Sequence, residues 1–240
     1  MKSGGLKLSY KDNDLVIDKL RSLIVKIQII DEREQVFSVG TGFFIDGKNI
    51  ITANHVILPV IMFNCYAKIL ENQTGRVIAS TNKVLAHSPN SDVNILELED
   101  EITRDDFEFV KFVTRPYYKR DFSYAAFGFP VSMTDGYYQN GRMIDDITDN
   151  EGNNFVQVSL GATSLDNYQG YSGAPVVCNG QLIGIAIEQT LGLNTVQSIK
   201  VLKAISFIEL LKDEWIRTDS FIEQVLETYK SESENEIEKN

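Results

Sequence analysis

The chain has 240 residues, of which 43% are hydrophobic and 24% charged. This is the composition of a soluble globular protein that buries a core without disulfide or metal staples. Its 34 acidic and 23 basic residues give a net charge of −11. Because no run of Lys and Arg is present either, a broad phosphate-binding surface is disfavoured. No stretch approaches the ~18 apolar residues of a membrane-spanning helix, and the start, MKSGGLKLSYKDND, lacks the apolar core of a signal peptide. We expect a cytoplasmic protein with no nucleic-acid or membrane partner.

The two cysteines, Cys65 and Cys178, form no CxxC pair. Zinc sites use clustered cysteines and histidines at short spacings, so no metal site is indicated. The expected state is two small buried thiols.

Strand patterns dominate the middle of the chain. Residues 12–22 have apolar positions near one face of a helix, but from residue 23 the chain turns to short β-branched stretches with Gly, Asn or Asp between them. We expect strands at residues 23–30, 36–46, 64–70, 76–87, 93–99, 123–130, 136–146, 154–161, 174–180, 181–189 and 194–200. Residues 49–57 are expected to start as a strand and to end in a turn of helix. Strands without alternating helices argue against a parallel α/β sheet and predict an all-β sandwich or barrel.

The end of the chain has a different pattern. Residues 201–215 show helical apolar spacing, and residues 219–230 predict a second helix with Asp219 or Ser220 as its N-cap. The charged tail from residue 231 is typical of a disordered terminus or a linker.

Three short segments bring together the groups that acyl transfer needs: TANHVI with His55, SDVNILEL with Asp92, and GYSGAPVV with Ser172. Each alone is commonplace, because a lone histidine is usually structural and a Gly-Ser-Gly turn is usually only a turn. Together they offer a base, a carboxylate to orient it and a hydroxyl nucleophile. The other histidine, His87, is expected in a loop and has no catalytic context.

Gly170, two residues before Ser172, adds a physical argument for acyl transfer. The nucleophile turn of an acyl-transfer enzyme presents backbone N–H groups to the developing oxyanion. Gly170 permits unusual backbone angles and leaves its amide unobstructed. The amides of Gly170 and Ser172 are therefore our candidate oxyanion hole.

These motifs resemble the trypsin-like serine peptidases, especially the bacterial intracellular and high-temperature-requirement branch. The resemblance spans about residues 23–200 and includes GTGFFI before the histidine segment. It implies two antiparallel six-stranded β-barrels of chymotrypsin type, followed here by C-terminal α-helices. It also implies a protein or peptide substrate and no cofactor. The implied organisation is an N-terminal helical extension at 1–22, a first barrel at 23–118, a second at 119–200, helices at 201–230 and a tail at 231–240.

Some family features are missing. Tyr171 precedes the nucleophile where secreted relatives carry Asp, and no Ile-Val-Gly-Gly start is present, so activation by N-terminal insertion is not expected. The chain after Lys200 is too short for a PDZ domain. By resemblance to trypsin, Asp166, six residues before Ser172, implies cleavage after Arg or Lys, with Gln189 and Glu188 on the pocket wall. The alternative is that Asp166 is a turn residue.

Three functions remain open. The first is an active endopeptidase. The second is a latent protease that awaits an activating partner protein or fused domain, as in bacterial defence or signalling. The third is a non-catalytic binding module on a protease fold. An α/β-hydrolase esterase is disfavoured because its order is Ser, Asp, His, whereas Ser172 comes last here.

Overall fold

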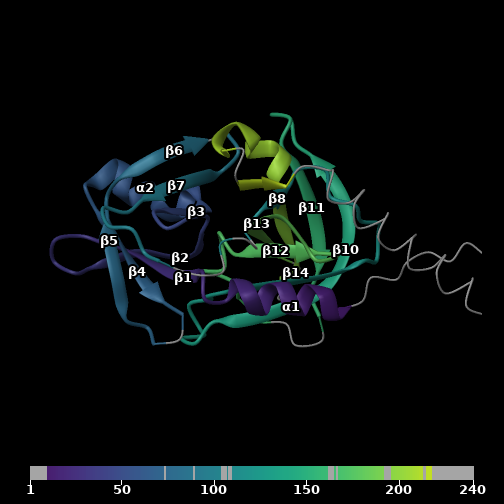
Figure 1. Cartoon of the computed structure of the whole chain (residues 1–240), viewed down its shortest axis with the longest axis horizontal. Coiled ribbons are helices and arrows are strands. Elements are labelled where there is room, and N and C mark those ends of the chain that lie inside the picture. The colour runs from purple at the N-terminus through teal and green to yellow at the C-terminus, as the bar shows by residue number, and fades with distance from the viewer. Residues whose placement is uncertain are drawn as a thin grey trace, which may run out of the picture.

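The protein forms two β-sheets that lie side by side, with short helices at their margins (Figure 1). The computed structural model describes residues 10–217, apart from 73, 89, 104–106, 108–109, 162–164, 166, 192–195 and 213–214. The first half of the chain builds one sheet and the second half the other, which confirms the all-β prediction.

The first sheet is antiparallel, in the order β5-β4-β1-β2-β3-β7-β6. Its strands are β1 (Ile24–Ile30), β2 (Val36–Phe44), β3 (Asn49–Ala53), β4 (Tyr66–Glu71), β5 (Val77–Thr81), β6 (Val84–Ser88) and β7 (Val93–Glu97), and helix α2 (Asn54–Phe63) follows β3.

This first sheet differs from the six-stranded barrel that we expected. It has seven strands, and no ladder among the described residues closes it. The predicted strand 76–87 is two strands because the Thr81 hydroxyl accepts the N–H of Lys83 at 3.0 Å and donates to the carbonyl of Glu97 at 2.6 Å. These bonds end β5, and the chain then continues into β6.

The second sheet closes into the predicted six-stranded barrel. Its strands are β9 (Ser123–Gly128), β10 (Tyr137–Thr148), β11 (Asn154–Ser159), β12 (Pro175–Cys178), β13 (Gln181–Leu191) and β14 (Val196–Lys203). Closure comes from β12, which pairs with both β9 and β13. The two-residue strands β8 (Phe112–Val113) and β15 (Ile216–Arg217), which we did not predict, extend the sheet beyond β13.

The N-terminal helix lies under the second barrel, although the first sheet follows it in the chain (Figure 1). This helix, α1 (Tyr10–Leu20), begins and ends two residues earlier than predicted. The buried Asn13 fixes it, because its amide donates to the carbonyl of Ser123 and its Oδ1 accepts the N–H of Gly180, both at 2.8 Å. The extension is thus part of the folded unit.

Two expectations need correction. Residues 201–203 belong to strand β14, since Val201 and Leu202 pair with both β11 and β13, and the helix that follows (η2, Ala204–Leu210) is a 3₁₀ helix. The predicted helix at 219–230 and the tail lie outside the described residues. His87 lies exposed on strand β6 and not in a loop, because it pairs with Asn94 of β7.

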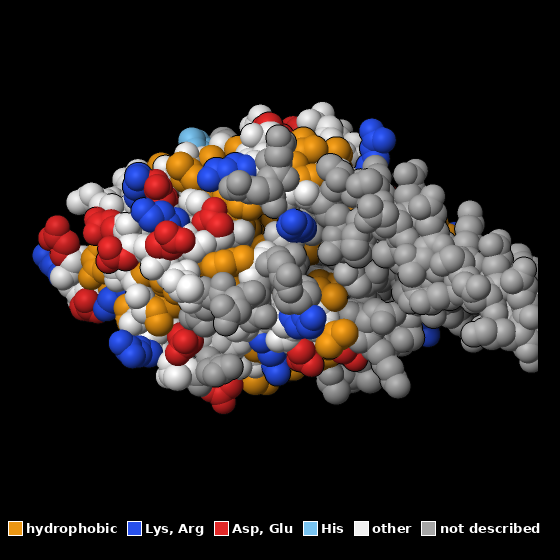
Figure 2. Space-filling model, viewed as in Figure 1, with side chains coloured by type: hydrophobic (Ala, Val, Ile, Leu, Met, Phe, Trp, Pro, Cys, Tyr) orange, Lys and Arg blue, Asp and Glu red, His pale blue; other side chains and the backbone are white. Residues whose placement is uncertain are grey.

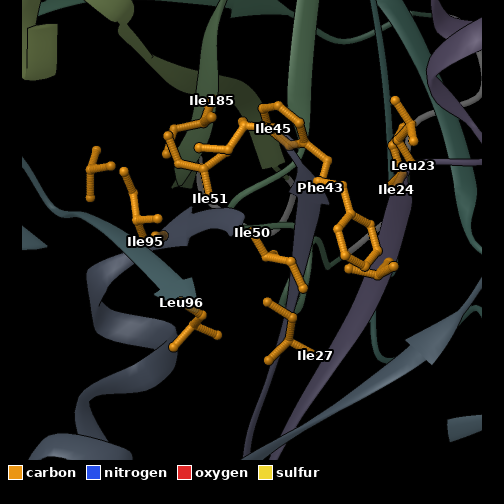
Figure 3. Close-up of a cluster of buried hydrophobic side chains, with 14 of the residues drawn as sticks. Leu23, Ile24, Ile27, Phe43, Ile45, Ile50, Ile51, Ile95, Leu96 and Ile185 are labelled. Carbon is orange, nitrogen blue, oxygen red and sulfur yellow. The ribbon is translucent and has the colours of Figure 1, made fainter. Parts of the chain in front are cut away.

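A continuous hydrophobic core joins the two halves. In Figure 3, Ile185 of β13 lies beside Ile45 and Ile51 of the first half. Cys65 and Cys178 are buried and unpaired, as predicted, and burial raises the pKa of the Cys178 thiol to about 12. The core therefore holds the two halves in a fixed relation.

The surface carries mixed charge. On the face shown in Figure 2, Lys and Arg side chains are scattered among acidic and hydrophobic ones. No helix in the described part of the chain is long and apolar enough to cross a membrane.

Candidate active site

His55 and Asp92 meet at the paired ends of two strands. Ala53, the last residue of β3, pairs with Val93, the first residue of β7. The residues just beyond this pair are therefore adjacent. His55 Nδ1 lies 2.7 Å from Asp92 Oδ2, and the main-chain N–H of His55 donates to Asp92 Oδ1 at 2.9 Å. The carboxylate thus fixes both the ring and the start of helix α2.

This contact determines how the histidine can act. A carboxylate beside Nδ1 places the proton there, and so leaves Nε2 as the basic nitrogen. The His55 side chain is 44% exposed, so the ring lies at the surface of the site. Asp92 has a φ of +53°, a left-handed conformation that Asp tolerates better than most residues.

The Asp92 turn is also tied to the second barrel. Ser91 is buried, and its Oγ lies 2.8 Å from Asn153 Oδ1 and 2.7 Å from the carbonyl oxygen of Ser206. The amide of Asn153 donates to the carbonyl of Asn90 at 2.8 Å. These contacts across the two halves were not foreseen from the sequence.

Ser172 lies on two consecutive tight turns. The N–H of Tyr171 donates to the carbonyl of Tyr168 at 2.8 Å, and the N–H of Ala174 donates to that of Tyr171 at 3.0 Å. The third residues of these turns, Gly170 and Gly173, have φ of +93° and +90°. Type II turns need such angles at that position, which glycine adopts without strain.

The two turns leave a specific pair of amides free. In residues 168–174, the N–H groups of Gly170 and Ser172 make no hydrogen bond to any described residue, whereas the other five are bonded. The bonded amides are those of Tyr168, Gln169, Tyr171, Gly173 and Ala174. The predicted oxyanion donors are therefore the two unpaired N–H groups of the loop.

The Ser172 hydroxyl is not bonded to His55, the residue that we expected to act as its general base. Ser172 Oγ donates to the carbonyl oxygen of Ile187 at 3.0 Å, and no hydrogen bond joins it to His55 in the described part of the chain. Two of the three predicted residues are thus bonded to each other, and the third is bonded within its own barrel.

Tyr171 is buried behind the serine. It is 2% exposed, and burial holds the pKa of its phenol well above the usual range. Its ring packs edge-on against that of Tyr168, with centroids 5.5 Å apart. The loop is held at this position by aromatic packing and not by an ion pair.

A cavity of about 320 Å³ opens beside Ser172, lined also by Ile187, Glu188, Gln189 and Ile199. Gln189 lines this cavity, and its Oε1 accepts the N–H of Tyr168 at 2.8 Å. The exposed Glu188 lies 3.8 Å from the Lys200 ammonium.

Asp166, the predicted selectivity residue, lies outside the described residues. The described lining combines apolar and aromatic residues with the Ser172 hydroxyl, the carboxylate of Glu188 and three amides, those of Asn167, Gln169 and Gln189.

Comparison with known proteins agrees with this architecture. Residues 40–185, more than half of the chain, match the family model of the trypsin-like peptidase domain, so the chain belongs to that family of peptide hydrolases. The match includes His55, Asp92 and Ser172.

Solved structures show the same chymotrypsin-like fold at low identity. The active form of the Rv3671c protease from M. tuberculosis has a TM-score of 0.60 at 22% identity and covers 83% of both chains. Its inactive form gives 0.61 at 18%, covering 83% of this chain and 92% of that one. Deg5 gives 0.60 at 17%, covering 85% and 94%. No curated protein matches.

Proposed function

We propose that the protein is a serine endopeptidase that cleaves protein or peptide substrates through an acyl-enzyme. The observation that carries the proposal is the combination of a bonded His55–Asp92 pair with a serine turn in which the main-chain N–H groups of Gly170 and Ser172 have no partner among the described residues. A base, its orienting carboxylate, a nucleophile and two oxyanion donors are the groups that acyl transfer requires.

In the proposed cycle, Ser172 Oγ attacks the scissile carbonyl carbon while His55 Nε2 takes the hydroxyl proton. Asp92 holds the ring and stabilises the imidazolium. The substrate carbonyl oxygen accepts hydrogen bonds from the main-chain N–H groups of Gly170 and Ser172. The proton then passes from Nε2 to the leaving amine as the C–N bond breaks. Water, deprotonated by the same nitrogen, attacks the acyl carbon, and Nε2 returns that proton to Ser172 Oγ as the ester bond breaks. Every step uses groups of this chain or water, and none needs a cofactor.

We further propose a preference for Arg or Lys before the scissile bond. Asp166 would supply a carboxylate partner for the cation. Glu188 and Gln189 also line the cavity, and the Glu188 carboxylate lies 3.8 Å from the Lys200 ammonium. A peptide library with mass-spectrometric mapping of the cut sites tests this. We expect cuts after Arg and Lys that decrease in Asp166→Asn, and equal cleavage after Leu and Arg would contradict the preference.

A second proposal concerns regulation by a partner or ligand. The hydrogen bond from Ser172 to Ile187 supports a resting state in which the nucleophile is not engaged with His55. A latent enzyme shows turnover that rises when the activator binds. Basal turnover equal to that of ordinary trypsin-like enzymes would contradict latency, and a folded protein that binds peptides without cutting them would favour the binding-module alternative.

A further inference from the structure

We propose that Thr41, on strand β2 of the first sheet, is a positioning residue that holds the oxyanion loop of the second barrel in its competent shape. The proposal rests on the function assigned above to Ser172 and its loop. Thr41 is fully buried and contacts the loop 129 positions further along the chain.

Thr41 makes four hydrogen bonds, three of which reach the second half of the molecule. Its hydroxyl donates to the carbonyl of Gly170 at 2.8 Å and accepts the N–H of Phe129 at 2.8 Å. Its N–H donates to the carbonyl of Ser172 at 2.9 Å, and its carbonyl accepts the hydroxyl of Thr52 at 2.7 Å. Because a hydroxyl has one proton and Phe129 supplies a donor, the Thr41 proton is directed to Gly170.

These bonds fix two peptide groups of the loop from both sides. A peptide group is planar, so bonds to its C=O and to its N–H set its orientation. In the group 170–171, the C=O is held by Thr41 and the N–H by the carbonyl of Tyr168. In the group 172–173, the C=O is held by Thr41 and the N–H by the carbonyl of Ala186.

The free N–H donor of Ser172 belongs to the peptide group between these two, and that of Gly170 to the group just before them. Neither N–H is bonded to a described residue, but each group is also held through its own C=O, that of Gln169 by the N–H of Val131 at 2.7 Å and that of Tyr171 by the N–H of Ala174 at 3.0 Å. The bonds of Thr41 fix the adjoining groups and so complete the set that directs the two donors. Removing the hydroxyl frees the carbonyl of Gly170 to turn, and with it the neighbouring amides.

Close backbone approach makes this arrangement possible. A Cβ added at Gly173 would lie 2.0 Å from the carbonyl oxygen of Thr41, and one at Gly40 would lie 2.4 Å from a methyl carbon of Val56. Glycine at both places lets β2 lie directly against the serine turn on one side and helix α2 on the other. The Thr41 side chain spans this contact through its hydrogen bond to the carbonyl of Gly170.

The alternative is that Thr41 is a structural core residue, whose hydroxyl is hydrogen-bonded but has no effect on the reaction. Thr81 serves as a matched control, because it is also buried on a strand, donates to a carbonyl (Glu97, 2.6 Å) and accepts a main-chain N–H (Lys83, 3.0 Å), but lies in the β5–β6 turn. Loss of either hydroxyl should lower stability to a similar extent. Only Thr41 should affect the reaction.

The test compares Thr41→Val, Thr41→Ser and Thr81→Val in the full chain, below their melting temperatures. We measure kcat, KM and the affinity for a peptide boronate, whose tetrahedral oxygen occupies the oxyanion hole. Thr41→Val should lower kcat and boronate affinity together by about ten- to a hundred-fold, somewhat less than the outright loss of an oxyanion donor. Its KM should change less than threefold. Thr41→Ser and Thr81→Val should keep both values within about threefold.

Equal kcat and boronate affinity in wild type and Thr41→Val would overturn the proposal, as would a parallel loss in Thr81→Val. If Thr41→Val does not fold, Thr41→Ser decides, because it keeps the hydroxyl and loses only a methyl. A tenfold loss in folded Thr41→Ser would then contradict it. A wild-type protein that neither cleaves peptides nor binds boronate would instead contradict the proposed function itself.

Discussion

The Ser172 hydroxyl donates a hydrogen bond to the carbonyl oxygen of Ile187, with an O···O distance of 3.0 Å. Ile187 lies at a register shift of β13, between Ala186 and Glu188, and has no partner on β14. Bulged positions of this kind often direct groups toward a site. Since Ile187 also lines the cavity beside Ser172, a peptide bound there meets a carbonyl whose present donor is the hydroxyl of Ser172, the proposed nucleophile.

We therefore predict that a substrate main-chain N–H displaces the Ser172 hydroxyl from Ile187 and frees it for His55. A peptidyl phosphonate with an N–H next to its reactive centre should modify Ser172 about tenfold faster than its N-methyl analogue, the equivalent of one hydrogen bond. The control carries the methyl one residue further away. Equal modification rates for the first pair would contradict the prediction.

Substitutions in the proposed triad should have unequal effects. Ser172→Ala and His55→Ala should each lower kcat by about a million-fold. Asp92→Asn should cost about ten-thousand-fold, because an amide facing Nδ1 favours the wrong imidazole tautomer. Stopped and continuous assays with a fluorogenic peptide measure these values. Substantial turnover by purified Ser172→Ala would disprove the assignment of the nucleophile.

The glycine after the serine should tolerate no side chain. Gly173 has a φ of +90° and lies against the carbonyl of Thr41, whereas Gly75 has a φ of +64° with no atom within 4 Å of an added Cβ. Alanine at either position costs about 1–2 kcal/mol of backbone strain. Gly173→Ala adds the clash, so kcat should also fall about a hundred-fold. Thermal unfolding and kcat are measured for Gly173→Ala and Gly75→Ala. Equal losses of Tm and kcat in the two variants would argue against a close approach at Gly173.

The buried phenol of Tyr171 should be dispensable. Its hydroxyl has no hydrogen-bond partner among the described residues, whereas that of Tyr124 donates to the carbonyl of Ser159 at 3.0 Å. Removing an unpaired buried hydroxyl is neutral or stabilising, and removing a bonded one costs about 1 kcal/mol. Tyr171→Phe should therefore keep or raise Tm, and Tyr124→Phe should lower it by about 2–4 °C. A lower Tm for Tyr171→Phe would show that the phenol has a partner.

Much of the fold was predictable because its strands are defined by local patterns. The alternation in stretches such as 154–161 and the turn residues between them depend on nearby residues alone. The break in 76–87 was not predictable, since it depends on the bond from Thr81 to Glu97, 16 positions away. The two-residue strands depend on distant partners, because β8 pairs with β13 and β15 pairs with β8.

The site shows the same division. The pairing of Ala53 with Val93 brings His55 to Asp92, and the three motifs were enough to suggest that pair. The bonds of Thr41 to the serine turn depend on the packing of two sheets and leave no local pattern beyond the flanking glycines. The partner of the Ser172 hydroxyl likewise depends on a bulge in β13.

The most direct test of the proposed serine peptidase is labelling of the purified full chain with a fluorophosphonate probe, with peptide mapping of the modified residue. We predict stoichiometric modification at Ser172, none in Ser172→Ala, and a rate that falls sharply in His55→Ala. Folded wild-type protein that carries the label on another residue would contradict a nucleophilic Ser172, whereas wild type that remains unlabelled would contradict a constitutively active site and favour the latent or non-catalytic alternative.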